Sequence, residues 1–171
     1  VISVIIVNFN GGDLLTECVC SVLTSTVCVT VHVVDNASSD DSILTLIKAI
    51  KDDKRVQIIN NVENLGFARA ANLALPYTTG EYLLFLNPDC LIHPDTLARF
   101  ASIMDKYPQT GMAGCLVRNP DGSEQAGCRR SVPTPWRTVV RVFHLDKLFP
   151  HSKRFKNFVL TCQPLPDKPT E

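Results

Sequence analysis

The sequence predicts an α/β domain with an open, mainly parallel sheet, and three observations support this fold class. Short β-branched runs alternate with helix-like segments four times in roughly the first hundred residues. The first run, VISVIIV, is apolar throughout, as expected for a strand that is buried on both faces. The length of 171 residues, with 45% apolar and 20% charged residues, suits one globular domain with a real hydrophobic core.

The predicted strands are short runs rich in Val, Ile, Leu or Phe. They cover residues 1–7, 29–35, 56–60, 80–87 and 111–117. Segments with helix-like spacing of apolar residues follow the first four strands. These segments cover residues 13–23, 43–50, 66–75 and 94–107. Each of the first four strands therefore leads into a helix, which is the chain order of a parallel sheet.

The second helix has a recognisable start in the stretch NASSDDS. Ser38 or Ser39 is the expected N-cap, because a seryl oxygen accepts a hydrogen bond from a free N–H of the first turn. Asp40 and Asp41 then fall within that turn, where the helix dipole favours negative charge.

The strand–helix pattern ends near residue 118, and charge changes sign soon after it. Residues 1–128 carry 8 Lys or Arg against 14 Asp or Glu, whereas residues 129–171 carry 9 against 3. The stretch from Arg129 to Lys156 contains eight basic residues and a single acid, Asp146. Such a basic segment with apolar neighbours is expected to contact an anionic membrane or a lipid-diphosphate acceptor.

An alternative for the same segment is an exposed apolar patch that drives homodimer formation. The patch would consist of Trp136, Val139, Val140 and Phe143. Nucleic-acid binding is not expected, because the net charge of the chain is zero and no recognised nucleic-acid-binding module is present.

The seven cysteines form no CxxC pair, and no histidines stand at finger-like spacing, so structural zinc is not expected. The odd number of cysteines and the absence of a signal-peptide pattern indicate reduced thiols and a cytoplasmic location. No apolar run reaches the roughly 20 residues that span a bilayer. The expected location is therefore the cytoplasm, including the inner face of the membrane.

Polar residues stand at the carboxyl ends of four predicted strands. They are Asn8-Phe9-Asn10, Asp35-Asn36, Asn60-Asn61 and Asn87-Pro88-Asp89. Ligands of parallel α/β sheets bind beyond these ends, so the four groups are expected to converge on one polar cleft. The stretch NFNGGDLL after the first strand lacks both the dinucleotide-binding glycine pattern and a phosphate-loop lysine.

The stretches IIVNFNGGDLL, VVDNASSDDS, NLGFARAAN and GEYLLFLNPDC resemble, in order and spacing, the family 2 glycosyltransferases with the GT-A fold. The resemblance is strongest to the bacterial rhamnosyltransferase-type branch and covers about residues 1–130. It implies an inverting enzyme that moves a sugar from a UDP- or dTDP-sugar, rhamnose included, to a glycan or lipid-linked acceptor. The product would be a surface polysaccharide or a lipid-linked glycan.

The resemblance also assigns expected roles to the first two strand ends. Phe9 and Asn10 match an aromatic-Asn pair whose ring packs on a pyrimidine base, and the alternative places Phe9 in the core. Asp35 matches an acid that accepts hydrogen bonds from the nucleoside, and the alternative makes it a cap of the next helix. Asn8 and Asn36 complete the expected donor-binding set at these ends.

The third helix is expected to bind phosphate through its start and one face. Gly66 lets the backbone approach a ligand and precedes free helix N–H groups. Arg69 and Asn72 are three residues apart and can point to the same cleft. For Arg69, the alternative is an ordinary surface charge.

The stretch Asn87-Pro88-Asp89 resembles the family's Asp-x-Asp element, with Asn87 in place of the first acid. Asp89 is then the remaining carboxylate for a divalent cation, Mn²⁺ or Mg²⁺, that stabilises the leaving nucleotide diphosphate. The alternative is a plain turn, since Pro and Asp are ordinary turn residues.

Inverting enzymes of this family need a general base, and no acid after residue 118 stands in a matching motif. The acids there are Asp121, Glu124, Asp146, Asp167 and Glu171. The general base is therefore expected outside this chain, since the family domain normally runs well beyond 171 residues. Residues 1–118 would bind the nucleotide-sugar, and residues 119–171 would form an acceptor-side loop and the basic segment of the same domain.

Two other functions remain open from the residues alone. A non-catalytic nucleotide-sugar-binding module would need no general base. A nucleotidyltransferase on a related α/β fold would carry a basic, Gly-rich loop after the first strand, and NFNGGDLL contains neither Lys nor Arg.

Overall fold

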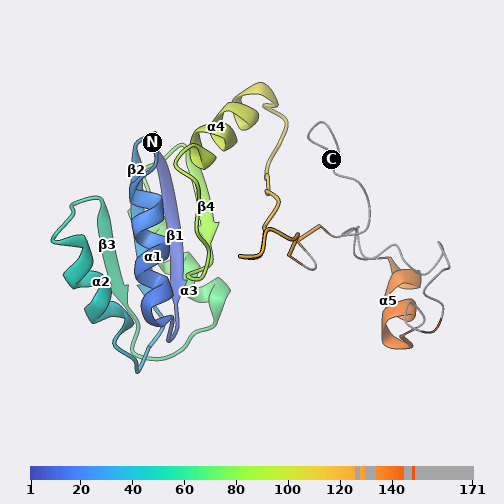
Figure 1. Cartoon of the computed structure of the whole chain (residues 1–171), viewed down its shortest axis with the longest axis horizontal. Coiled ribbons are helices and arrows are strands. Elements are labelled where there is room, and N and C mark those ends of the chain that lie inside the picture. The colour runs from blue at the N-terminus through green and yellow to red at the C-terminus, as the bar shows by residue number, and fades with distance from the viewer. Residues whose placement is uncertain (126–127, 130–133, 145–147, 149–171) are drawn as a thin grey trace. The chain divides into compact units, whose positions relative to one another are not determined.

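The computed structural model describes residues 1–125, 128–129, 134–144 and 148. The chain divides into two compact units, Val1–Gly111 and Met112–Glu171 (Figure 1). The first unit holds the sheet and four of the α-helices, and it carries every residue that the sequence assigns to the donor-binding set.

Four strands form a single parallel sheet in the order β3-β2-β1-β4, which confirms the predicted class. They are β1 (Ile2–Asn8), β2 (Val29–Asp35), β3 (Val56–Asn60) and β4 (Tyr82–Leu86). All seven residues of β1 are buried, because β1 is a central strand with helices on both faces of the sheet.

One face of the sheet packs against α1 (Gly12–Leu23) and α2 (Ser42–Ile50), and the other packs against α3 (Phe67–Ala74) (Figure 1). The first interface contains Val4 and Ile6 of β1 together with Leu15 and Val19 of α1. On the opposite face, three alanines of α3 lie against Ile5 and Val7, and their small side chains permit close contact. Each large apolar side chain buried in this way contributes about 1.5–3 kcal/mol.

Three further helical segments stand among the described residues, and one of them adds the buried Leu97 to the first interface. A short 3₁₀ turn, η1 (Leu75–Tyr77), follows α3 directly. The helix α4 (Thr96–Lys106) begins beside the amino ends of the strands. There the backbone N–H of Thr26, just before β2, donates to the Pro94 carbonyl at 3.1 Å. In the second unit, α5 (Pro135–Val142) is the element predicted as a basic amphipathic segment.

The predicted N-cap of the second helix is wrong by two or three residues. The N-cap is Asp41 and α2 begins at Ser42, so Asp40 precedes the helix. The hydroxyl of Ser38 instead donates to Asp35 at 2.6 Å. The N–H and the hydroxyl of Ser39 donate to the side-chain oxygen of Asn10, just after β1. The two seryl side chains therefore tie the strand ends together and do not cap the helix.

The predicted fifth strand is also wrong, since residues 111–117 contain no strand. Gly111 and Gly114 weaken β propensity, and Val117 is the one β-branched residue of the stretch. Extended pairing begins only at the end of this stretch, where Gln125 N–H donates to the Val117 carbonyl at 2.9 Å and Arg118 forms an isolated antiparallel bridge. No helix in the described ranges is long and apolar enough to cross a membrane.

Candidate functional site

The carboxyl ends of the strands meet at one edge of the sheet because the strands are parallel and in register. Asn8 is opposite Asp35 in the β1–β2 pair, and Asp35 is opposite Asn60 in the β2–β3 pair. On the other side, Ile6 is opposite Leu86, so the residues after β4 begin level with the end of β1. This edge is where the polar groups predicted from the sequence stand.

A buried hydrogen-bond network joins the ends of β1 and β2. The fully buried Asn8 side-chain nitrogen donates to Asp35 Oδ1 at 3.0 Å, to Ser38 Oγ at 3.0 Å and to Ser42 Oγ at 2.8 Å. The Asn8 carbonyl oxygen accepts the Gly11 N–H at 3.2 Å. One amide thus connects β1, β2 and the starts of α1 and α2.

Asp35 is 8% exposed, and its carboxylate is engaged from the protein side. Oδ1 accepts from Asn8 and from the Ser38 hydroxyl, and Oδ2 accepts the Ser38 N–H at 3.3 Å. A carboxylate offers about four acceptor positions, so these three contacts leave some capacity for a ligand. Asp35 therefore does not cap α2, whose N-cap is Asp41, and instead holds a turn around Ser38.

The loop after β1 holds an aromatic ring outward between two anchored asparagines. Asn10 has φ 54°, its N–H donates to Ser38 Oγ at 2.9 Å, and its side-chain oxygen accepts the Ser39 N–H at 2.8 Å. Phe9, between Asn8 and Asn10, is 51% exposed. Phe9 therefore offers an open ring face at the edge of the sheet and is not part of the core.

Asn36 organises the loop that leads into α3. Its side-chain oxygen accepts from Asn61 Nδ2 and from the Leu65 N–H, both at 3.0 Å, and its nitrogen donates to Asn64 at 2.7 Å. Asn64 in turn accepts the Gly66 N–H at 2.9 Å. Because its hydrogen-bonding groups are used within the protein, Asn36 fixes the approach to α3 and has little left for a ligand.

Gly66 stands immediately before α3 with φ 75° and ψ 163°, a conformation that is essentially restricted to glycine. No protein atom lies within 4 Å of a Cβ built at this position, other than its chain neighbours. Arg69 and Asn72 are both exposed and three residues apart on α3. In the described part of the chain, Arg69 has no acidic partner.

The segment after β4 is a β-turn in which the Cys90 N–H donates to the Asn87 carbonyl at 3.2 Å. Asn87 and Asp89 are exposed on this turn. Among the described residues, no three His, Cys, Asp or Glu side chains gather as a metal site. The expected plain turn is therefore real as backbone geometry, and it leaves the Asp89 carboxylate facing solvent.

The thiol of Cys18 lies beneath this turn and was not singled out from the sequence. Cys18 is fully buried in α1, and its Sγ donates to the Asn87 carbonyl at 3.4 Å. Burial, together with the nearby Cys90 and Asp89, raises the pKa of the Cys18 thiol to about 12. Cys18 and Asn87 are 69 residues apart in the sequence, so no local pattern could have revealed this buried contact.

The acids of the second unit that the structure describes are engaged by neighbouring groups. Asp121 accepts the Ser123 N–H at 2.8 Å and its hydroxyl at 2.6 Å, and these hydrogen bonds lower the pKa of Asp121. Glu124 forms a two-pronged pair with Arg129, which lowers the pKa of Glu124. Both are weak bases as a result, while Asp146, Asp167 and Glu171 lie outside the described residues.

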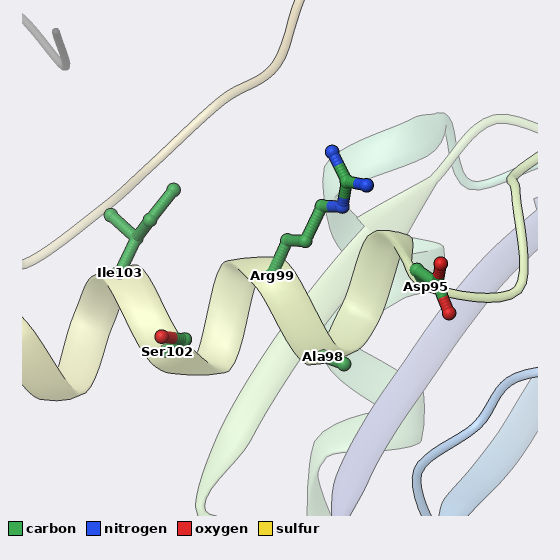
Figure 2. Close-up of a pocket in the computed structure, with 5 residues that line it drawn as sticks. All are labelled: Asp95, Ala98, Arg99, Ser102 and Ile103. Carbon is green, nitrogen blue, oxygen red and sulfur yellow. The ribbon is translucent and has the colours of Figure 1, made fainter.

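A shallow surface hollow lies on α4 and is lined by Asp95, Ala98, Arg99, Ser102 and Ile103 (Figure 2). Figure 2 shows that these side chains all come from the start and middle of this one helix. The helix begins beside the amino ends of the strands, so the hollow is remote from the polar edge and carries none of its residues.

Known proteins are similar to this chain in sequence and in fold. The sequence profile of one family, described as glycosyl transferase family 2, matches residues 3–161. An uncharacterized glycosyltransferase of Haemophilus influenzae is 27% identical over 106 residues, covering 61% of this chain and 33% of that protein. The teichoic acid poly(glycerol phosphate) polymerase of Staphylococcus epidermidis is 32% identical over 102 residues, covering 58% and 14%. The chain thus spans a third or less of these relatives' length.

Two solved structures resemble the present one. The S. aureus TarS 1-349 structure in complex with UDP-GlcNAc matches with a TM-score of 0.56 and 26% identity, over 63% of this chain and 32% of that one. The mannosyltransferase PcManGT from Pyrobaculum calidifontis, in complex with GDP-Man and Mn²⁺, matches with a TM-score of 0.58 and 25% identity, over 70% and 36%. These neighbours confirm the GT-A fold that the sequence predicts.

Proposed function

This chain belongs to glycosyl transferase family 2, and from that membership we propose that it binds the donor of a sugar-transfer reaction. The donor is a nucleotide-diphosphate sugar, a UDP- or dTDP-sugar, with rhamnose among the sugars. The acceptor is a glycan or a lipid-linked glycan, and the transfer inverts the anomeric centre. The observation that carries this proposal is the alignment of an open aromatic ring, a buried acid and an exposed acid along one sheet edge.

The nucleoside end of the donor fits the loop after β1. An open ring face such as that of Phe9 provides base stacking worth about 1–3 kcal/mol, with little dependence on which base is bound. Asp35 accepts a hydrogen bond from the base or the ribose with its remaining acceptor capacity. Asn8 does not touch the donor in this proposal, since its amide is used to hold Asp35, Ser38 and Ser42 in place.

The diphosphate fits the start of α3. Gly66 has no side chain to obstruct a ligand, and the first N–H groups of the eight-residue helix attract negative charge. Arg69 and Asn72 supply a cation and an amide from the exposed side of the same helix. Both side chains contact phosphate in this proposal.

Asp89 and Asn87 suit a divalent cation that is shared with the donor. Mg²⁺ and Mn²⁺ are commonly bound through one or two carboxylates, water and substrate phosphates, so one exposed carboxylate fits such a shared site. Such a cation stabilises the negative charge of the leaving diphosphate. The neighbour PcManGT was solved with GDP-Man and Mn²⁺, which supports this assignment.

A donor-binding module without its own general base is the second candidate function. It is favoured by Asp121 and Glu124, the described acids beyond residue 118, whose carboxylates are held by Ser123 and Arg129 and whose pKa values are lowered. In the proposed enzyme, the general base is therefore not drawn from these two residues.

The second unit is proposed to contact an anionic membrane surface. Trp136, Val139, Val142 and Phe143 are exposed on and just after α5, whereas Val140 is 4% exposed and so does not belong to the expected patch. The stretch from Arg129 to Lys156 adds eight basic residues. Binding to phosphatidylglycerol vesicles that weakens as salt is raised supports this contact, and a salt-independent homodimer assigns the patch to self-association instead.

Calorimetric titration of UDP, dTDP and GDP, with and without Mn²⁺, tests the donor site. We expect one nucleotide to bind more tightly with Mn²⁺ than without it, and Asp89→Asn to remove the Mn²⁺ effect. Phe9→Ala is expected to weaken binding about 5- to 150-fold, which is the loss of one stacking contact. Absence of binding by all three nucleotides under both conditions would rule out the donor site.

A matched control lies on the same loop. Asp95→Asn removes a partly exposed acid, the N-cap of α4, which lies beside the amino ends of the strands. Its titration curves should overlay those of the unmodified protein. An equal loss in Asp95→Asn and Asp89→Asn would show that net charge, and not the turn, governs Mn²⁺ binding. Transfer of labelled sugar to an acceptor then separates the enzyme from the binding module.

A further inference from the structure

We propose that Cys18 and Ser21 of α1 are positioning residues that hold the Asn87–Ile92 loop and so set the affinity of the Asp89 site for its divalent cation. This inference rests on the proposed function of Asp89. Neither residue reaches the donor in this proposal, because both act through the backbone of the loop.

Cys18 holds the turn itself. Its Sγ donates to the Asn87 carbonyl at 3.4 Å, and this carbonyl also closes the turn by accepting the Cys90 N–H at 3.2 Å. The backbone of Cys90 contacts the same sulfur. A single buried side chain therefore meets both ends of the turn that carries Asp89.

Ser21 holds the loop at a second point, one helical turn further along α1. The Ser21 hydroxyl accepts the Ile92 N–H at 3.2 Å and donates to the Cys18 carbonyl at 2.7 Å. Residues three apart lie on the same side of a helix, so both side chains face the loop. The exposed turn is thus attached to a helix that belongs to the core.

The same helix is attached at its start to the nucleoside end of the site. The Gly11 N–H donates to Asn8 at 3.2 Å, and the Gly12 N–H donates to Asp40 at 2.9 Å. The helix α1 therefore links the Asn8 network to the turn of Asp89. Fixing this separation matters chemically, because a cation on Asp89 must meet the phosphates of a nucleotide bound near Phe9.

The thiol suits this role because it can donate to a backbone carbonyl from within the core. A thiol is a weak donor, but this one is fully buried and is aimed at a carbonyl. Serine keeps a donor at this position, whereas valine keeps the volume without one.

The test compares Cys18→Ser with Cys18→Val. Free Mn²⁺ is measured by electron paramagnetic resonance in the presence of UDP or of whichever nucleotide binds. We expect Cys18→Val and Cys18→Ala to weaken Mn²⁺ binding about three- to tenfold, the loss of one hydrogen bond, and Cys18→Ser to stay within about twofold. Ser21→Ala should weaken it by a similar factor. Cys20→Ala, which removes an exposed thiol from the same helix, is the matched control and should have no effect.

Amide exchange in the metal-free protein gives a second readout. The Cys90 amide should exchange faster in Cys18→Val, and the Ile92 amide should exchange faster in Ser21→Ala, with the core of β1 unchanged. If Cys18→Val behaves as the unmodified protein and Cys18→Ser does not, Cys18 only fills space and the inference is wrong. If the unmodified protein binds nucleotide without any Mn²⁺ dependence, the metal role of Asp89 fails, and unchanged amide exchange would then remove the positioning role as well.

Discussion

Asn8→Ala should lower the free energy of unfolding by more than the loss of one hydrogen bond would. The Asn8 amide is fully buried and contacts Asp35, Ser38 and Ser42, while its oxygen accepts the Gly11 N–H. Alanine can replace none of these contacts. The substitution therefore removes the one group that joins both strands to both helix starts.

The expected magnitude follows from the partners that are left behind. A hydrogen bond to a charged group contributes about 1.5–3 kcal/mol, and a buried donor without a partner costs about 1–3 kcal/mol. Asp35 keeps two contacts from Ser38, and the seryl hydroxyls can turn to other acceptors, so the full sum is not reached. We expect the free energy of unfolding to fall by about 2–4 kcal/mol, which lowers Tm by roughly 4–16 °C.

Thermal unfolding of the metal-free protein measures this effect, with Asn72→Ala as the matched control. Asn72 is an asparagine on the exposed side of α3, where alanine has the higher helix propensity. Its Tm should stay level or rise slightly, although nucleotide binding should weaken. If Asn8→Ala changes Tm by no more than Asn72→Ala does, the buried amide is not what holds the strand ends together.

Three further substitutions and one chemical probe test other parts of the fold. Burial lowers the pKa of His32 below 6.5, so the unfolded state binds more protons than the folded state below that pH. The free energy of unfolding should therefore be highest above pH 6.5 and should fall as the pH drops through the folded-state pKa. Urea titrations at pH 5 and 7.5 should show this fall in the unmodified protein and not in His32→Gln. Gly80→Ala places a Cβ 2.6 Å from the backbone nitrogen of Ser3 in β1 and should lower the free energy of unfolding by about 1–3 kcal/mol. The control, Gly114→Ala, has no such neighbour within 4 Å and should leave it unchanged. Similar urea midpoints for the two variants would contradict the clash. Iodoacetamide at pH 8 should label the exposed Cys20 well before Cys18, whose thiol has a pKa raised to about 12, and peptide mass spectrometry would reveal any reversed order.

The sheet could be predicted from the sequence because its signals are local and strong. Unbroken β-branched runs mark buried parallel strands, and the predicted bounds of β2 and β3 agree with the structure residue for residue. Once the strands are known to be parallel, their carboxyl ends must lie at one edge. The placing of Asn8 beside Asp35 therefore follows from strand order and register and needs no knowledge of side-chain contacts.

The seryl contacts could not be predicted, because hydrogen-bond partners compete over long sequence separations. Ser38 has the right residue type and place for a helix cap, but Asn8, 30 residues earlier, and Asp35 use its hydroxyl. Cys18 is a similar case, since only the folded chain brings it under Asn87. The prediction of a strand at 111–117 is wrong for a different reason, namely that two glycines oppose the strand that its apolar residues favour.

A structural role and a ligand-binding role need not compete at this sheet edge. The stretch Asn87-Pro88-Asp89 is an ordinary turn by its backbone hydrogen bond, and because it turns there, the Asp89 carboxylate faces solvent. Asp35 likewise holds the turn at Ser38 while keeping some acceptor capacity. A freely moving acid would bind a cation or a nucleoside less well, since its own ordering would oppose binding. Substitutions that keep the acid but loosen its support, such as those at Asn8 and Cys18, should therefore weaken ligand binding without removing any group that touches the ligand.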